Sequence, residues 1–178
     1  MPRFRTFRIA VAALAVLALA GCGKAQQMAA PQATAGPTIV YESSGLDPAQ
    51  YSSSPTDTLT ASQTIDGGQG GHVGVGSYRV DVPPGAIVGK ATITIVQPDP
   101  AILQCELSIS PESANKFLVP VILTVKLPST TALVDQNFWF DNSASLWCLI
   151  STSPDAASLE LHSQLWHFSK YATGRAGW

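Results

Sequence analysis

The sequence predicts an all-β protein, an antiparallel β-sandwich that follows a signal peptide and a flexible linker. From Leu59 onward, short segments alternate between apolar and polar residues, which is the two-residue period of a half-buried strand. These segments recur about every ten to fifteen residues, with turn-rich stretches such as PESANK and DNSAS between them and no helical period. Only 12% of the residues are charged, while Thr, Ser, Val, Gly and Pro are plentiful. This composition is typical of an exported β domain.

The chain begins with a segment typical of secretory signal peptides. Arg3, Arg5 and Arg8 precede an apolar run from Ile9 to Ala20. The run is shorter than the roughly 20 apolar residues that cross a bilayer, and it ends in small residues, so cleavage is favoured over a permanent membrane helix. We therefore expect residues 1–21 to be removed.

The cleavage site carries a more specific pattern. Leu19-Ala20-Gly21-Cys22 resembles the lipobox of bacterial lipoproteins, in which the Cys thiol receives diacylglycerol and becomes the mature N-terminus. The resemblance implies a membrane anchor at Cys22, because several acyl chains attach a protein stably where one chain is marginal. The alternative is an ordinary signal peptide with a chance cysteine. Gly23 replaces the Asp that tends to retain lipoproteins in an inner membrane, so the expected location is the cell envelope, with the outer membrane favoured if there are two.

The segment 22–57 is predicted to be the lipidated Cys followed by a flexible linker. It is rich in Ala, Gln, Pro, Ser and Thr and has too few large apolar residues to offset the entropy of ordering. Removal of the three signal-peptide arginines from the 10 Lys+Arg leaves 7 against 12 Asp+Glu, a net charge of −5. No basic stripe remains, so no nucleic-acid partner is expected. No cofactor and no metal site are predicted either.

The domain itself is expected at residues 58–178. Tyr78, Val80 and Val82 share one face of an early strand, and a Pro-Pro-Gly-Ala turn leads to the next strand, ATITIV. The later predicted strands are LQCELSIS, FLVPVILTVKL, NFWFD, SLWCLIS and SLELHSQLWHF. About 120 residues are enough for a single hydrophobic core.

One strand and three tryptophans of this domain lead to further expectations. The segment 117–127 has the longest apolar face, and Pro120 within it predicts an edge strand or a bulge. Trp139, Trp147 and Trp166 take the phase opposite to the expected core residues. We expect them to be core and rim residues, and the alternative is a stacked aromatic binding face.

The two cysteines of the domain form an even pair. Cys105 and Cys148 each fall on the apolar phase of an alternating segment, and an exported protein lies in an oxidising compartment. We therefore expect a disulfide between them, which would add about 4 kcal/mol in the chain-entropy model. The alternative is two buried free thiols packed as small hydrophobic groups.

The residues IDGGQGGHVGVGSYRVDVPPGAIVGKATITI, numbers 65–95, resemble the opening of a ZU-five domain. This family is named for zonula occludens and the uncoordinated netrin receptors, and it also occurs in ankyrins and in bacterial exported proteins. Its hallmarks are the Gly-Gly pair, here Gly67-Gly68, and the turn Pro83-Pro84-Gly85-Ala86. The resemblance covers about 59–172, and it implies a β-sandwich that serves as a non-enzymatic binding or assembly module. An unknown envelope protein or glycan is the expected partner.

The segment LWHFSKYA near the C-terminus resembles the closing strand of that family and adds an alternative function. Some animal relatives cleave themselves at His-Phe-Ser. Carried onto this chain, Ser169 would be the nucleophile, His167 its base, and Phe168-Ser169 the cleaved bond. Strand alternation places His167 and Ser169 on one face, which suits both catalysis and plain hydrogen bonding. We expect no enzymatic activity, and self-cleavage is the alternative.

Overall fold

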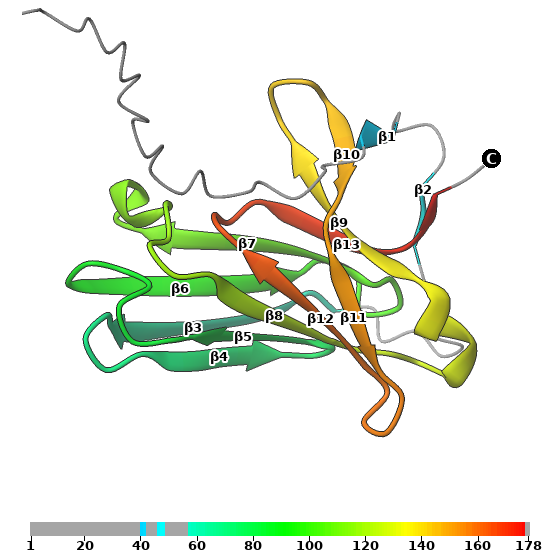
Figure 1. Ribbon diagram of the computed structural model, residues 1–178, viewed down its shortest axis with the longest axis horizontal. Coiled ribbons are helices and arrows are strands. Elements are labelled where there is room, and N and C mark those ends of the chain that lie inside the picture. The colour runs from blue at the N-terminus through cyan, green and yellow to red at the C-terminus, as the bar shows by residue number, and fades with distance from the viewer. Residues whose placement is uncertain (1–39, 42–45, 49–56, 177–178) are drawn as a thin grey trace, which may run out of the picture. The chain divides into compact units, whose positions relative to one another are not determined.

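A computed structural model describes residues 40–41, 46–48 and 57–176. Two antiparallel sheets pack against each other, which confirms the predicted all-β sandwich (Figure 1). The predicted signal peptide 1–21 and the predicted lipidation site Cys22 lie outside the described residues. Within the described part of the chain, no helix has the length and apolar character needed to span a membrane.

The large sheet contains eight strands among the described residues. Its strands are β1 (Val40–Tyr41), β2 (Leu46–Pro48), β3 (Leu59–Asp66), β6 (Lys90–Gln97), β7 (Gln104–Ser110), β9 (Gln136–Asp141), β10 (Leu146–Leu149) and β13 (Lys170–Ala176). Their order is β1-β10-β9-β13-β7-β6-β3, and β2 pairs with β13. The strand β3 is therefore one edge of this sheet.

The small sheet contains five strands in the order β11-β12-β8-β5-β4. They are β4 (Gly71–Val75), β5 (Tyr78–Val82), β8 (Val121–Lys126), β11 (Thr152–Asp155) and β12 (Glu160–Leu165). Two short 3-10 helices, η2 (Glu112–Ala114) and η3 (Thr130–Val134), lie in the connections before and after β8. The strand β4, which follows β3 in the chain, forms one edge of the small sheet.

The core lies between the sheets and follows the predicted alternation. In β5, β6 and β8, every second residue is buried while its neighbours are partly or fully exposed. The largest fully buried apolar side chains are Ile93, Ile95, Leu103, Leu123, Leu161, Val80, Val121, Val125 and Tyr171. Burial of these side chains is the main stabilising contribution, at about 25 cal/mol per Å² of apolar surface.

The strand predicted at 117–127 is shorter than expected. The strand β8 begins at Val121, just after Pro120, and it pairs with β5 and β12 on its two sides. The predicted edge position or bulge at Pro120 is therefore wrong. A residue without an N–H cannot join the ladder of a central strand, so the strand starts after it.

The sheet also includes residues on the N-terminal side of the predicted domain boundary at 58. The strand β1 pairs with β10, and β2 pairs with β13. Both strands fall inside the segment 22–57 that was predicted to be a linker. Backbone pairing needs no large apolar side chain, and the prediction relied on the absence of such side chains.

The predicted disulfide is wrong, because Cys105 and Cys148 are both free thiols. They lie in one row across four neighbouring strands, with Tyr171 opposite Cys105, Trp139 opposite Tyr171, and Cys148 opposite Trp139. Three strand spacings separate their Cα atoms by about 14 Å. A disulfide needs a Cα separation of about 7 Å or less.

The two thiols instead match the alternative of packed, buried cysteines. Burial raises the pKa of the Cys105 thiol well above its usual value, and the nearby Glu106 carboxylate raises it further. Burial also raises the pKa of Cys148, with a contribution from Asp141. Both thiols are thus held in the protonated form, which is a poor nucleophile.

Candidate functional site

Four connections meet at one end of the sandwich, which we call the loop end (Figure 1). They are the segments 67–70 between β3 and β4, 83–89 between β5 and β6, 111–120 between β7 and β8, and 166–169 between β12 and β13. The three sequence motifs that prompted the family resemblance lie in three of these connections. Residues far apart in the chain therefore build one surface.

Backbone hydrogen bonds join these four connections to one another. The amide of Gly67 donates to Gly89 O (2.7 Å), and Gly85 N–H donates to Gly67 O (2.7 Å). The remaining links are Leu118 N–H to Ala86 O (3.0 Å) and Phe117 N–H to Trp166 O (3.0 Å). Because each loop is bonded to the next, the loop end is a single hydrogen-bonded unit.

The two glycines of the Gly-Gly motif have different roles. A Cβ on Gly67 would lie 2.8 Å from the carbonyl carbon of Ile87 and 2.9 Å from its Cγ1, closer than real Cβ contacts. On Gly68 the nearest atom would be Asp66 Oδ1 at 3.4 Å. Only Gly67 is required by close backbone packing.

The Pro-Pro-Gly-Ala element is a turn, as its residues predict. Gly85 has φ +84°, a conformation that residues with a Cβ rarely adopt. Ala86 is completely buried beneath the turn. The carbonyl of Ala86 accepts the hydrogen bond from Leu118, so the turn also anchors the segment before β8.

Asn115 is a site residue that sequence reasoning missed. Its Oδ1 accepts the Phe168 N–H at 2.6 Å, and its Nδ2 donates to the Phe168 carbonyl oxygen at 3.2 Å. The side-chain amide thus makes the two hydrogen bonds to the Phe168 backbone that a neighbouring strand would otherwise make. The same Nδ2 donates to Glu112 Oε1 at 3.1 Å. No sequence signal identifies this role, because Asn115 lies in a turn-rich stretch where asparagine is common.

The structure does not bring the predicted catalytic side chains into contact. The Ser169 hydroxyl donates to Phe140 O at 2.7 Å. The His167 ring stands edge-on to Trp139, with centroids 4.7 Å apart, and its Nδ1 is 3.4 Å from Phe168 O. Within the described part of the chain, His167 and Ser169 share no side-chain hydrogen bond. In this arrangement His167 is not positioned to accept the Ser169 proton.

Phe168, between these two residues, is a packing residue. Its ring is buried and meets the Phe117 ring edge-on, with centroids 4.7 Å apart. The neighbouring backbone is also held, since Tyr171 OH donates to His167 O at 2.6 Å. The segment His-Phe-Ser is thereby held by side chains from the connection 111–120 and from β13.

The loop end exposes large apolar side chains. Val88 is 80% exposed, Leu118 68% and Trp166 53%, and Val119 is also exposed. We call these four residues the apolar rim. They lie on three connections that are joined by the backbone hydrogen bonds given above. These bonds bring the exposed apolar residues to the same end of the sandwich, and contiguous exposed apolar surface is typical of binding sites.

The alternative of an aromatic face on three tryptophans is not found. Trp139 lies opposite Cys148, whereas Trp147 lies opposite Phe140. Consecutive residues of a strand point to opposite faces, so Trp139 and Trp147 are on different sides of the large sheet. Trp166 belongs to the apolar rim instead.

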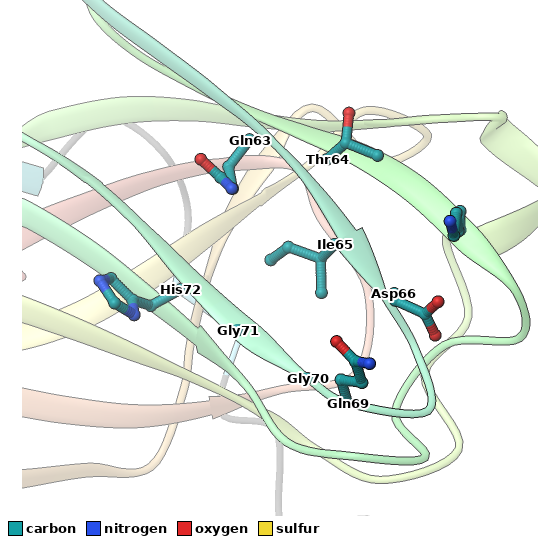
Figure 2. Close-up of a pocket in the computed structure, with 9 residues that line it drawn as sticks. Gln63, Thr64, Ile65, Asp66, Gln69, Gly70, Gly71 and His72 are labelled. Carbon is teal, nitrogen blue, oxygen red and sulfur yellow. The ribbon is translucent and has the colours of Figure 1, made fainter.

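A pocket of about 430 Å³ lies beside the loop end, between the edge strands β3 and β4 (Figure 2). Gln63, Ile65 and Gln69 lie in the gap between these strands, while Thr64 and Asp66 are on the other side of β3. Gly71 faces Ile65, and a Cβ on Gly71 would lie 3.4 Å from Ile65 Cγ1. Because glycine has no Cβ, this space next to Ile65 stays open.

The histidines do not form a metal site. His72, a residue of β4, lines the pocket, and His162 Nδ1 lies 3.1 Å from Thr124 Oγ1 between two other strands of the small sheet. Across the described residues, no three His, Cys, Asp or Glu side chains are grouped so that they could hold a metal ion.

Comparison of the chain with family models gives no match, and comparison with curated proteins gives none either. The resemblance to the ZU-five family therefore stays a prediction from the quoted motifs. The structure adds that these motifs gather at one end of a β-sandwich.

Proposed function

We propose that this protein is a lipoprotein of the bacterial cell envelope whose β-sandwich is a non-enzymatic, ZU-five-like binding or assembly module. The observation that carries the proposal is the apolar rim, which exposes Trp166, Leu118 and Val88 on loops that are tied together. Loops that are already hydrogen-bonded to one another lose little conformational entropy when a partner binds, and tryptophan is enriched in protein interfaces. The partner is an envelope protein or a glycan.

The binding role is tested by crosslinking in envelopes followed by pull-down of the full mature chain. Leu118→Asp places a charge in the apolar rim, so it should deplete any partner that the wild type enriches. Val134→Asp is the matched control, since Val134 is equally exposed at 68% but lies on η3, beyond the other end of β8. Equal recovery with both variants, or no enrichment by the wild type, would count against the rim as a binding surface.

The membrane anchor is part of the proposal and rests on the lipobox. Labelled palmitate is expected to enter the wild-type protein and to be absent from Cys22→Ser, which should also leave the membrane fraction. Equal labelling of the two proteins would exclude Cys22 as the lipidation site.

Self-cleavage at Phe168-Ser169 is the second candidate, favoured by one contact. The Asn115 Nδ2 donates to the oxygen of the Phe168 carbonyl, whose carbon Ser169 would attack, as a donor in an oxyanion hole does. Against it, the Ser169 hydroxyl is hydrogen-bonded to Phe140 O, and the His167 ring packs edge-on against Trp139.

We expect the purified mature protein to remain one chain through Trp178. Intact mass under denaturing conditions decides the point, because a cleaved strand held by hydrogen bonds would separate there. A mass ending at Phe168, restored to full length in Ser169→Ala, would establish cleavage and overturn the non-enzymatic function.

A further inference from the structure

Among the described residues, the second edge of β3 has no strand partner, and only Asp66 at its end is engaged there, because its carbonyl accepts hydrogen bonds from Gln69 and Gly70. All eight of its residues pair with β6 in unbroken register, from Leu59 opposite Gln97 to Asp66 opposite Lys90. Among the strands that the structure describes, β3 pairs only with β6. Before Asp66, the backbone N–H and C=O groups on the other side of β3 therefore point away from the sheet, where another strand can bind them.

The other sheet edges are less suited to receive a strand. The strand β11 has four residues, including Pro154 and Asp155, and β1 has two residues. The strand β4 has five residues and contains Gly71 and Gly74. By contrast, β3 contains neither proline nor glycine, and its only charged residue is the last one. It lacks the bulges, prolines and central charges with which proteins normally block edge pairing.

On the outer face of the sheet, hydroxyl side chains of β3 bond to hydroxyl side chains of its partner β6. The Ser62 hydroxyl bonds to Thr94 at 2.7 Å, and the Thr64 hydroxyl bonds to Thr92 at 2.9 Å. A strand added on the open side would place its own alternate residues next to Ser62 and Thr64. Threonine or serine at those positions would extend the row of hydroxyl hydrogen bonds.

The inner face of the open edge is lined by the pocket between β3 and β4. Ile65, which is almost completely buried, and Gln63 both lie between the two strands (Figure 2). Alternate side chains of an added strand would point into this space. Most of the lining is polar, with Gln63, Gln69 and His72 among its residues, and Gly71 leaves room beside Ile65.

We propose that the open edge of β3 and the adjacent pocket bind an extended segment of another polypeptide as an antiparallel strand. The segment has threonine or serine at alternate positions, and the side chains between them point toward the pocket. Main-chain hydrogen bonds provide the affinity, and the hydroxyl row and the pocket select the side chains. This site is separate from the apolar rim, so it goes beyond the proposed function and does not depend on it.

The probe is a labelled peptide with the sequence of β6, KATITIVQ, which already pairs with β3 on its other side. Fluorescence polarisation with the full mature chain should show saturable binding. Gln63→Lys adds a charge to the exposed part of β3 that lines the pocket and should weaken binding at least about tenfold. Ser153→Lys is the matched control, because Ser153 is exposed on β11, the far edge of the small sheet, and it should bind like the wild type.

Two methylated peptides separate strand pairing from apolar adsorption. One carries N-methyl groups on both threonines, and the other carries them on both isoleucines. In a strand, alternate residues direct their N–H groups to the same edge, so only one of the two peptides should lose binding. Turning a peptide over to present its other edge would exchange its threonine and isoleucine faces.

Three binding results would overturn the proposal. They are no binding of the unmodified peptide, equal binding of the two methylated peptides, and equal binding by Gln63→Lys and wild type. A wild-type dimer that Gln63→Lys converts to a monomer in analytical ultracentrifugation would assign the edge to a second copy of this chain, which also overturns it. Peptide binding by Leu118→Asp at wild-type strength would show that the edge works independently of the apolar rim.

Discussion

Replacing Phe168 by alanine is expected to lower the free energy of unfolding by about 3 to 5 kcal/mol. The ring is only 5% exposed and packs edge-on against Phe117, so its removal leaves a cavity where the closing segment meets the core. Urea unfolding followed by tryptophan fluorescence measures the change. The decrease in the free energy of unfolding shows how much the packing of Phe168 stabilises this end of the sandwich.

Trp166→Ala is the matched control for Phe168→Ala. Trp166 is a larger aromatic residue on the same connection, but it is 53% exposed, so its loss should cost about 1 kcal/mol or less. A loss below about 1 kcal/mol for Phe168→Ala, or equal losses for the two variants, would mean that Phe168 is not packed as described.

Gly67→Ala is expected to be at least as destabilising, with a loss of about 4 kcal/mol or more. The added Cβ would meet the backbone of Ile87, at 2.8 Å from its carbonyl carbon, and that backbone is held by the bonds on either side of it. The clash would separate the connection 67–70 from the connection 83–89. Thermal unfolding of the wild type and the variant gives the difference.

Gly68→Ala provides a control one residue away. The nearest contact of the added Cβ would be the side-chain oxygen Oδ1 of Asp66 at 3.4 Å, which is ordinary contact, so we expect a change within about 1 kcal/mol. If the two glycine variants had equal stability, the close packing at Gly67 would be refuted, and the Gly-Gly pair would have to act through backbone freedom alone.

The strands could be predicted from the sequence because their alternation is local. Tyr78, Val80 and Val82 are buried as their spacing predicts. Pairing between strands is not local, and it explains why the disulfide predicted between Cys105 and Cys148 is not formed. Both do face the core, as expected, but two other strands lie between them. Alternation determines the face of a residue and does not determine which strand is its neighbour.

The loop end shows the same limit. The sequence identified the Pro-Pro-Gly-Ala turn, since Pro and Gly have fixed conformational preferences. It could not show that Asn115 bonds the backbone of Phe168, because those residues are 53 positions apart. The exposure of Leu118 and Val119 was also missed. The alternating pattern placed them in a strand that begins only at Val121.

The most direct measurement is native-state amide hydrogen exchange at the loop end. The amides of Gly67, Gly85, Phe117, Leu118 and Phe168 all donate hydrogen bonds between connections. If the four connections form one unit, these five amides should be protected about as well as the amides of the central strand β8, and they should lose protection together in Gly67→Ala. Exchange of these amides at the rate of an unstructured peptide, while β8 stays protected, would contradict a structured binding end.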